Sequence, residues 1–142
     1  MEKVLIIDGQ GGGLGRQLVS ELKKAFPELQ ITAVGTNSLA TSAMLKAGAD
    51  HCATGENAVL VAARKAEYIL GPLGILIADA LLGEITPAMA LAVAQSPAKK
   101  ILLPVNQCGN IVVGINESSH SRLIPEAVEA LRQARKQETC RD

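Results

Sequence analysis

The stretch Val4-Leu5-Ile6-Ile7-Asp8-Gly9-Gln10-Gly11-Gly12-Gly13-Leu14-Gly15-Arg16 decides the fold that we expect for this chain of 142 residues. An apolar run closed by glycine is typical of a strand that is buried on both faces, as in a parallel sheet. From Leu14 onward, apolar residues recur at helical spacing until Pro27 closes the segment. We therefore predict a strand, a glycine loop at residues 9–15 and a helix, in that order.

This glycine loop has the chemistry of an anion site. Glycines let the backbone turn tightly and leave its N–H groups accessible, and the first turn of the following helix carries a partial positive charge. Together these donors suit a phosphate group or another anion. We therefore expect the loop to bind a phosphate-containing small molecule, with a nucleotide or a dinucleotide among the candidate cofactors.

The spacing of the glycines separates this loop from two common nucleotide motifs. The dinucleotide pattern G-x-G-x-x-G ends on Leu14 when it is read from Gly9, and on Arg16 when it is read from Gly11. The phosphate loop G-x-x-x-x-G-K-[ST] fails as well, because Arg16-Gln17 follows Gly15 in place of the lysine and the hydroxyl residue. What fits is G-x-x-x-G-[IL]-G.

The G-x-x-x-G-[IL]-G pattern resembles the cofactor loop of short-chain dehydrogenases. That resemblance implies a dinucleotide, yet two features of the chain speak against dehydrogenase chemistry. The Tyr-x-x-x-Lys pair is absent, because the single tyrosine, Tyr68, is followed four residues later by Pro72. The chain is also long enough for only one domain, which leaves no substrate region.

Composition narrows the class of partner. The formal net charge is zero and aromatic residues make up 1% of the chain, so we expect no nucleic-acid binding. No apolar run approaches the ~20 residues that a membrane-spanning helix needs. Met1-Glu2-Lys3 leads straight into the first strand, and three cysteines without metal spacing fit a reducing compartment. These features predict a cytoplasmic protein without a signal peptide.

Strand-like and helix-like segments alternate along the rest of the chain. Strands are predicted at residues 30–34, 50–53, 68–70 and 101–105, and helices at residues 39–47, 56–65, 87–95 and 122–137. The five residues between 105 and 111 suffice for a hairpin, so residues 111–115 are expected to form an antiparallel edge strand. This order predicts an α/β three-layer Rossmann-like sandwich with a mostly parallel sheet of five or six strands. Residues 1–137 form the single domain, and residues 138–142 belong to a charged, frayed tail that begins near Arg135.

In a parallel sheet, ligands bind beyond the carboxyl ends of the strands. Thr36 and Asn37 follow the second strand, where dinucleotide enzymes place an acid for the ribose, and no acid stands there. Thr36 and Asn37 either donate to a ligand or cap the next helix. Asn106 follows the fifth strand and either reaches the crevice or forms a turn. The candidate binding residues are Asp8, Gly9, Gly11, Gly12, Gly13, Leu14, Gly15, Arg16, Thr36, Asn37, Asp79 and Asn106.

Two charged residues of the loop leave alternatives open. Asp8 would repel a phosphate, so it either holds a ribose hydroxyl, binds a cation, or accepts hydrogen bonds from N–H groups of the loop, and we favour the last role. Arg16 opposes the dipole of the helix, which a nearby anion would compensate. A solvated surface arginine explains Arg16 equally well.

A second candidate region is Ile75-Leu76-Ile77-Ala78-Asp79-Ala80-Leu81-Leu82-Gly83-Glu84. Its apolar residues predict a buried or interface helix that ends at Gly83. An apolar helix of this kind favours a homo-oligomer, in which it would lie at the subunit interface. Asp79 is then a single acid among apolar residues. Its carboxylate is expected to be paired with another polar group, exposed at one edge of the helix, or functional.

Over nearly its full length the chain resembles a small bacterial family of uncharacterised Rossmann-like domains. The segments that carry this resemblance are Ile7-Asp8-Gly9-Gln10-Gly11-Gly12-Gly13, Gly35-Thr36-Asn37-Ser38, Ala53-Thr54-Gly55-Glu56-Asn57 and Gly83-Glu84-Ile85-Thr86-Pro87. Gly35-Thr36 and Gly71-Pro72-Leu73-Gly74 are also faintly similar to the phosphate site of methylglyoxal synthase, although Ile75 replaces the acid of that enzyme.

Three functions remain open from the sequence. The first is a module that binds a nucleotide or another phosphorylated small molecule at the glycine loop. The second is a small enzyme that acts on such a ligand with Asp8, Asp79 or Glu84 as acid or base. The third is a structural interaction protein that binds no ligand.

Overall fold

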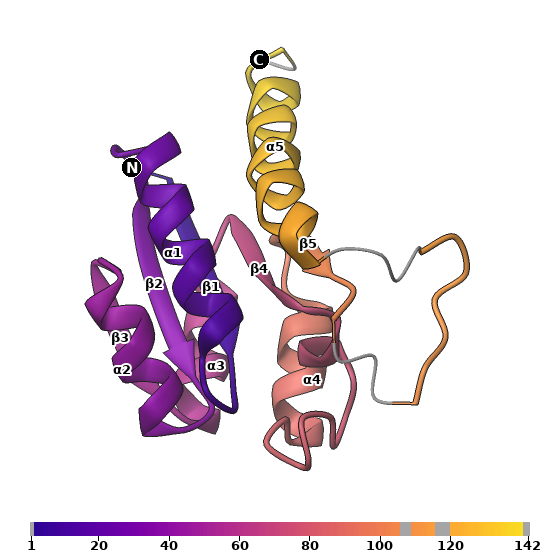
Figure 1. The fold of residues 1–142 in the computed structure, drawn as a ribbon. Helices are drawn as coiled ribbons and strands as arrows, with labels where there is room; N and C mark the ends of the chain where they lie inside the picture. The colour runs from indigo at the N-terminus through magenta and orange to yellow at the C-terminus, as the bar shows by residue number, and fades with distance from the viewer. Residues whose placement is uncertain (1, 106–108, 116–119, 141–142) are drawn as a thin grey trace.

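The structure is a computed structural model that describes residues 2–105, 109–115 and 120–140. Strands and helices alternate from the N-terminus onward (Figure 1). The elements are β1 (Lys3–Asp8), α1 (Gly13–Ala25), β2 (Gln30–Gly35), α2 (Ser38–Lys46), β3 (His51–Thr54), α3 (Glu56–Lys65), β4 (Tyr68–Pro72), the 3-10 helix η1 (Leu73–Leu76), α4 (Pro87–Gln95), β5 (Lys99–Leu103) and α5 (His120–Thr139).

Five parallel strands form one sheet in the order β3-β2-β1-β4-β5. The chain builds outward from β1 to β3, then crosses back and adds β4 on the other side of β1. The order therefore reverses between β1 and β4, and the carboxyl ends of these strands flank the crevice where such sheets bind ligands. The glycine loop follows β1 at this position.

Helices cover both faces of the sheet. On one face α1, α2 and α5 pack over β1, β2 and β4, with Leu18, Met44 and Leu131 in a shared core. On the other face α3 and α4 pack against the same strands through Val59 and Val93. The predicted three-layer arrangement with a parallel sheet is confirmed, and within the described residues no helix is both long and apolar enough to cross a membrane.

The predicted antiparallel edge strand is wrong. Residues 111–115 lie outside the sheet, which ends at β5, and Figure 1 shows them extending away from the body of the domain. Gly114 has a φ of 90°, so the chain turns inside the segment that should have been extended. The prediction rested on the short connection between residues 105 and 111, which would suit a hairpin, and it overlooked this turn. Asn106, for which a place in the crevice and a turn were both left open, lies outside the described residues.

The predicted apolar helix near Ile75 is also wrong. The 3-10 helix ends at Leu76, and residues 77–85 form a series of turns in which Asp79, Leu81 and Leu82 adopt the left-handed conformation. Leu82 is 97% exposed. The segment therefore offers no buried or interface helix. The preceding strand β4 runs through Gly71 and Pro72, two residues beyond its predicted end at residue 70.

At the C-terminus, α5 runs two residues beyond the predicted end at Gln137. Arg135, where fraying was expected to begin, lies 3.1 Å from Glu2 and 3.0 Å from Glu28. The hydroxyl of the buried Tyr68 donates to the carboxylate of Glu138 over 2.5 Å. These contacts fix the last turns of the helix on the sheet.

Candidate functional site

Asp8, the last residue of β1, holds the glycine loop in place. Its side chain is 6% exposed. One carboxylate oxygen accepts the N–H of Gly9 at 2.8 Å and the other accepts the N–H of Gly15 at 2.7 Å. Asp8 thus ties the end of the strand to the first turn of α1. The structural role that we favoured for this residue is confirmed.

Burial of Asp8 raises the pKa of its carboxyl, and the hydrogen bonds from Gly15 and Gly9 only partly offset this effect. The negative charge of Glu84 adds to the increase, so the net pKa of Asp8 is raised. The two carboxylates are therefore close enough to influence each other. Both carboxylate oxygens of Asp8 accept hydrogen bonds from the loop. This structural role is enough to explain why a carboxylate is buried at this position.

Three of the five glycines in the loop are required by packing. A side chain at Gly12 would lie 2.7 Å from the Cα of Ala40 in α2, and Gly12 has a φ of 74°. A side chain at Gly15 would meet the sulfur of Met44 at 2.6 Å. At Gly9 it would meet the Thr36 hydroxyl oxygen at 2.5 Å. These glycines allow the loop to pack against its neighbours.

Packing against the described residues does not require glycine at the other two positions, Gly11 and Gly13. A Cβ atom at Gly11 or at Gly13 would face open space, with no atom within 4 Å. Both residues are exposed, and neither has a positive φ. Glycine at these positions leaves the backbone accessible from outside.

The same part of the loop carries open hydrogen-bond donors. A helix leaves its first four N–H groups without intrahelical partners. At the start of α1, the N–H groups of Gly12, the residue just before the helix, and of Gly15 are satisfied inside the loop. In residues 2–105, 109–115 and 120–140, nothing accepts a hydrogen bond from the N–H of Gly11, Gly13 or Leu14. Two donors in the first turn of the helix, from Gly13 and Leu14, and one in the loop before it, from Gly11, are therefore available to an anion.

Arg16 adds a positive charge to this end of α1. Its side chain is exposed and borders the groove between α1 and α5. The other cations of this groove, Lys24 and Arg132, pair with Glu21 and Glu129. No acid of the described chain pairs with Arg16.

Glu84 is the residue that sequence reasoning undervalued. It was considered only as a candidate acid or base, yet its carboxylate connects the loops that follow β1 and β2. It accepts hydrogen bonds from the N–H of Gln10 at 3.1 and 3.2 Å, from the hydroxyl of Thr36 at 2.7 Å, and from the amide of Asn37 at 2.6 Å. An acid from the turns after η1 therefore contacts Thr36 and Asn37, the two residues that follow β2. No local pattern around Glu84 indicates this long-range contact.

Thr36 and Asn37 are thus engaged inside the protein. Asn37 also caps α2, since its side-chain oxygen accepts the N–H of Ala40 at 2.9 Å. The capping alternative for this residue is confirmed. Asp79 is exposed in the turns, and its carboxylate makes no hydrogen bond or ion pair with the loop among the described residues. Its N–H donates to the carbonyl of Ile85 at 2.7 Å. Within the described part of the chain, no cluster of histidine, cysteine or acidic residues could hold a metal ion.

Burial raises the pKa of Glu84, but the hydrogen bonds from Thr36, Asn37 and Gln10 outweigh it, so the net pKa lies below its ordinary value of 4.5. This stabilisation is present above about pH 4.5 and is lost as the pH falls through the lower pKa of the folded state. We expect Glu84→Ala to lower the free energy of unfolding by about 1–3 kcal/mol at pH 7, because its donors lose their acceptor.

Urea denaturation from pH 7 down to pH 3 measures this effect. The stability difference between the wild type and Glu84→Ala should shrink below about pH 4.5. The exposed Glu67→Gln serves as the control and should leave the curve unchanged. A difference that stays constant with pH would show that the ionised carboxylate does not contribute.

Comparisons with known proteins place the chain in a family. One solved structure with similarity to it is a dodecameric FMN-dependent UbiX-like decarboxylase from Escherichia coli O157:H7, with 18% identity over 94% of this chain and 75% of that one, and a TM-score of 0.44. No match was found among curated proteins. The expectation of an uncharacterised Rossmann-like family is confirmed by a family model that matches residues 3–136. The chain therefore belongs to the family described as Domain of unknown function (DUF3842).

Proposed function

We propose that this domain binds a phosphorylated small molecule, such as a nucleotide, at the glycine loop and the first turn of α1. The observation that carries the proposal is the pair Gly11 and Gly13. Both are exposed glycines with open space in front of them and with N–H groups that no described residue uses. A ligand that approaches the backbone closely gives a reason for glycine at both positions.

The charge distribution supports a phosphate as the bound group. The N–H groups of Gly13 and Leu14 lie at the positive end of the helix dipole, which favours an anion. Arg16 stands one turn into the same helix without an acidic partner in the described residues, and a phosphate would compensate its unfavourable position. Glu84 already occupies the N–H of Gln10, so the phosphate is expected at the remaining donors.

Isothermal titration calorimetry with AMP and with inorganic pyrophosphate tests the proposal. We expect the wild type to bind at least one of these probes. Gly13→Asp should weaken that binding at least about tenfold, because a carboxylate would stand where the phosphate is expected, and tenfold corresponds to about 1.4 kcal/mol. The fold should tolerate this change, since an acid is favourable in the first turn of a helix.

Two further variants separate charge from other effects. Gly13→Asn has nearly the same size as Gly13→Asp without its charge, so it should weaken binding less. Gln17→Ala, an exposed change one turn further along α1, should leave the affinity unchanged. If the wild type binds neither probe, or if Gly13→Asp binds as the wild type does, the loop is not a phosphate site.

A further inference from the structure

Glu84 places a negative charge at the edge of the proposed phosphate site. Its carboxylate accepts the N–H of Gln10 at 3.1 and 3.2 Å. Gly11, the next residue along the chain, has one of the N–H groups that are open to a ligand. Because consecutive Cα atoms are about 3.8 Å apart, a phosphate on Gly11 would lie within roughly 10 Å of this carboxylate, where salt screens the charges only in part. The charge of Glu84 also reaches into the loop, since it contributes to the raised pKa of Asp8.

The loop has open donors for one phosphate group. Of the seven N–H groups in residues 9–15, four are taken by acceptors of the protein itself, namely those of Gly9, Gln10, Gly12 and Gly15. The three that remain match the three terminal oxygens of a phosphate monoester. The nearest further donors, the hydroxyl of Thr36 and the amide of Asn37, are bound to Glu84. A second phosphate would therefore have to compete with Glu84 for them.

The protein fixes Glu84 in this position. Leu81 and Ile85, on either side of it in the chain, are 3% and 1% exposed. The N–H of Glu84 donates to the carbonyl of Leu81 at 3.2 Å. Gly9 makes room for the carboxylate, because a Cβ atom there would lie 3.3 Å from Oε1 of Glu84. The hydrogen bonds that the carboxylate accepts hold the pKa of Glu84 below its ordinary value, so the group is ionised at neutral pH.

We propose that Glu84 makes the site select ligands with a single phosphate group, such as a nucleoside monophosphate, over ligands with two phosphates in series. This inference rests on the proposed phosphate site. A monophosphate needs only the three open donors and the charge of Arg16. A second phosphate adds negative charge near Glu84, and like charges a few ångströms apart near a protein surface change an affinity by tenfold or more.

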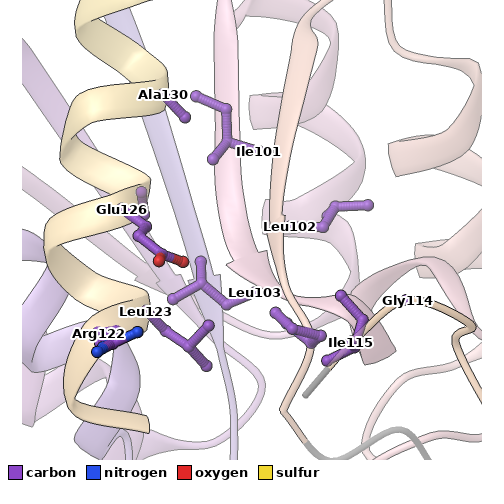
Figure 2. A pocket seen from close by; sticks show the side chains of 11 residues that line it. Ile101, Leu102, Leu103, Gly114, Ile115, Arg122, Leu123, Glu126 and Ala130 are labelled. Atoms are coloured by element: carbon purple, nitrogen blue, oxygen red, sulfur yellow. The ribbon is translucent and has the colours of Figure 1, made fainter. Parts of the chain in front are cut away.

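The groove of about 460 Å³ between β5 and α5 does not offer the same chemistry. Figure 2 shows Arg122 and Glu126 on successive turns of α5, with the apolar Ile101 and Leu103 of β5 opposite. One cation and one acid line this groove, so the charges of its lining cancel. Arg122→Gln should therefore leave the binding of phosphorylated ligands unchanged.

Isothermal titration calorimetry with AMP and ADP, without divalent metal ions, tests the selection. We expect the wild type to bind AMP at least about tenfold more tightly than ADP. Glu84→Gln keeps the size of the side chain without its charge and should reduce this preference to less than about threefold. Glu84→Asp keeps the charge and should keep the preference. Both variants disturb the same hydrogen bonds, so a purely structural role of Glu84 would affect AMP and ADP alike in both.

Two controls accompany these variants. Glu67→Gln removes an equal charge before the first residue of β4, at the opposite edge of the sheet, and should leave the preference unchanged. Added sodium chloride should shrink the preference of the wild type, because salt screens repulsion. This measurement needs no variant. Circular dichroism verifies that the variants are folded.

The failure of the selection and the failure of the phosphate site give different results. A wild type that binds ADP as tightly as AMP, a preference that grows with salt, or a Glu84→Gln variant that keeps the preference would overturn the role of Glu84 alone. A wild type that binds neither AMP nor pyrophosphate would overturn the phosphate site and this inference with it.

Discussion

Gly12→Ala is expected to lower the free energy of unfolding by about 2–6 kcal/mol. The added methyl group would stand 2.7 Å from the Cα and 3.0 Å from the carbonyl oxygen of Ala40. Both are main-chain atoms of α2, which cannot move aside as the end of a flexible side chain can. Such overpacking costs about 1–3 kcal/mol, and the left-handed φ of 74° adds about 1–3 kcal/mol for a residue with a side chain.

Urea denaturation at neutral pH measures the effect of Gly12→Ala, and Gly13→Ala is its matched control. The control replaces the adjacent glycine, where the methyl group meets open space. It should change stability by less than about 1 kcal/mol and can increase it, because alanine restricts the unfolded chain. Equal losses in both variants would contradict the division of the loop into glycines required by packing and glycines left open.

Asp8→Asn is expected to destabilise the domain by about 2–4 kcal/mol. Asparagine can accept one of the two hydrogen bonds that Asp8 receives, from Gly9 and Gly15. Its amide group must then face one of these N–H donors in a buried place. A hydrogen bond to a charged group contributes about 1.5–3 kcal/mol, and an unsatisfied buried donor adds a desolvation penalty.

The pH dependence of this variant gives an independent test. Because the pKa of Asp8 is raised in the folded state, the folded state holds its proton to a higher pH than the unfolded state does. The stability of the wild type should therefore fall as the pH rises from about 3.8 through the raised pKa, and Asp8→Asn should lack this component. Asp79→Asn, an exposed change in the turns, should alter neither stability nor its pH dependence. An Asp8→Asn variant as stable as the wild type would contradict the role of Asp8 in holding the loop.

Local patterns predicted most of the fold. The apolar run before Asp8, the helical spacing after Leu14 and the Thr86-Pro87 helix start depend on neighbouring residues, and the structure has β1, α1 and α4 at these places. The role of Asp8 was also within reach, because its partners are at most seven residues away in the sequence.

The errors arose where local propensity was a poor guide. The turns at residues 77–85 place Leu81 and Leu82 in the left-handed conformation, which no residue pattern indicates for leucine. The contact of Glu84 with Gln10 spans 74 residues and depends on the order of the strands in the sheet. Long-range contacts of this kind follow only from the tertiary arrangement.

The ion pair between Arg135 and Glu2 has a consequence for how the domain assembles during synthesis. The two residues are 133 positions apart, and α5 supplies Leu131 and Ile124 to the core that also contains Tyr68 and Leu70. As a nascent chain leaves the ribosome, one face of β4 therefore lacks its cover until α5 has emerged. We infer that the domain closes late in translation, and that truncation before α5 leaves a chain prone to aggregation.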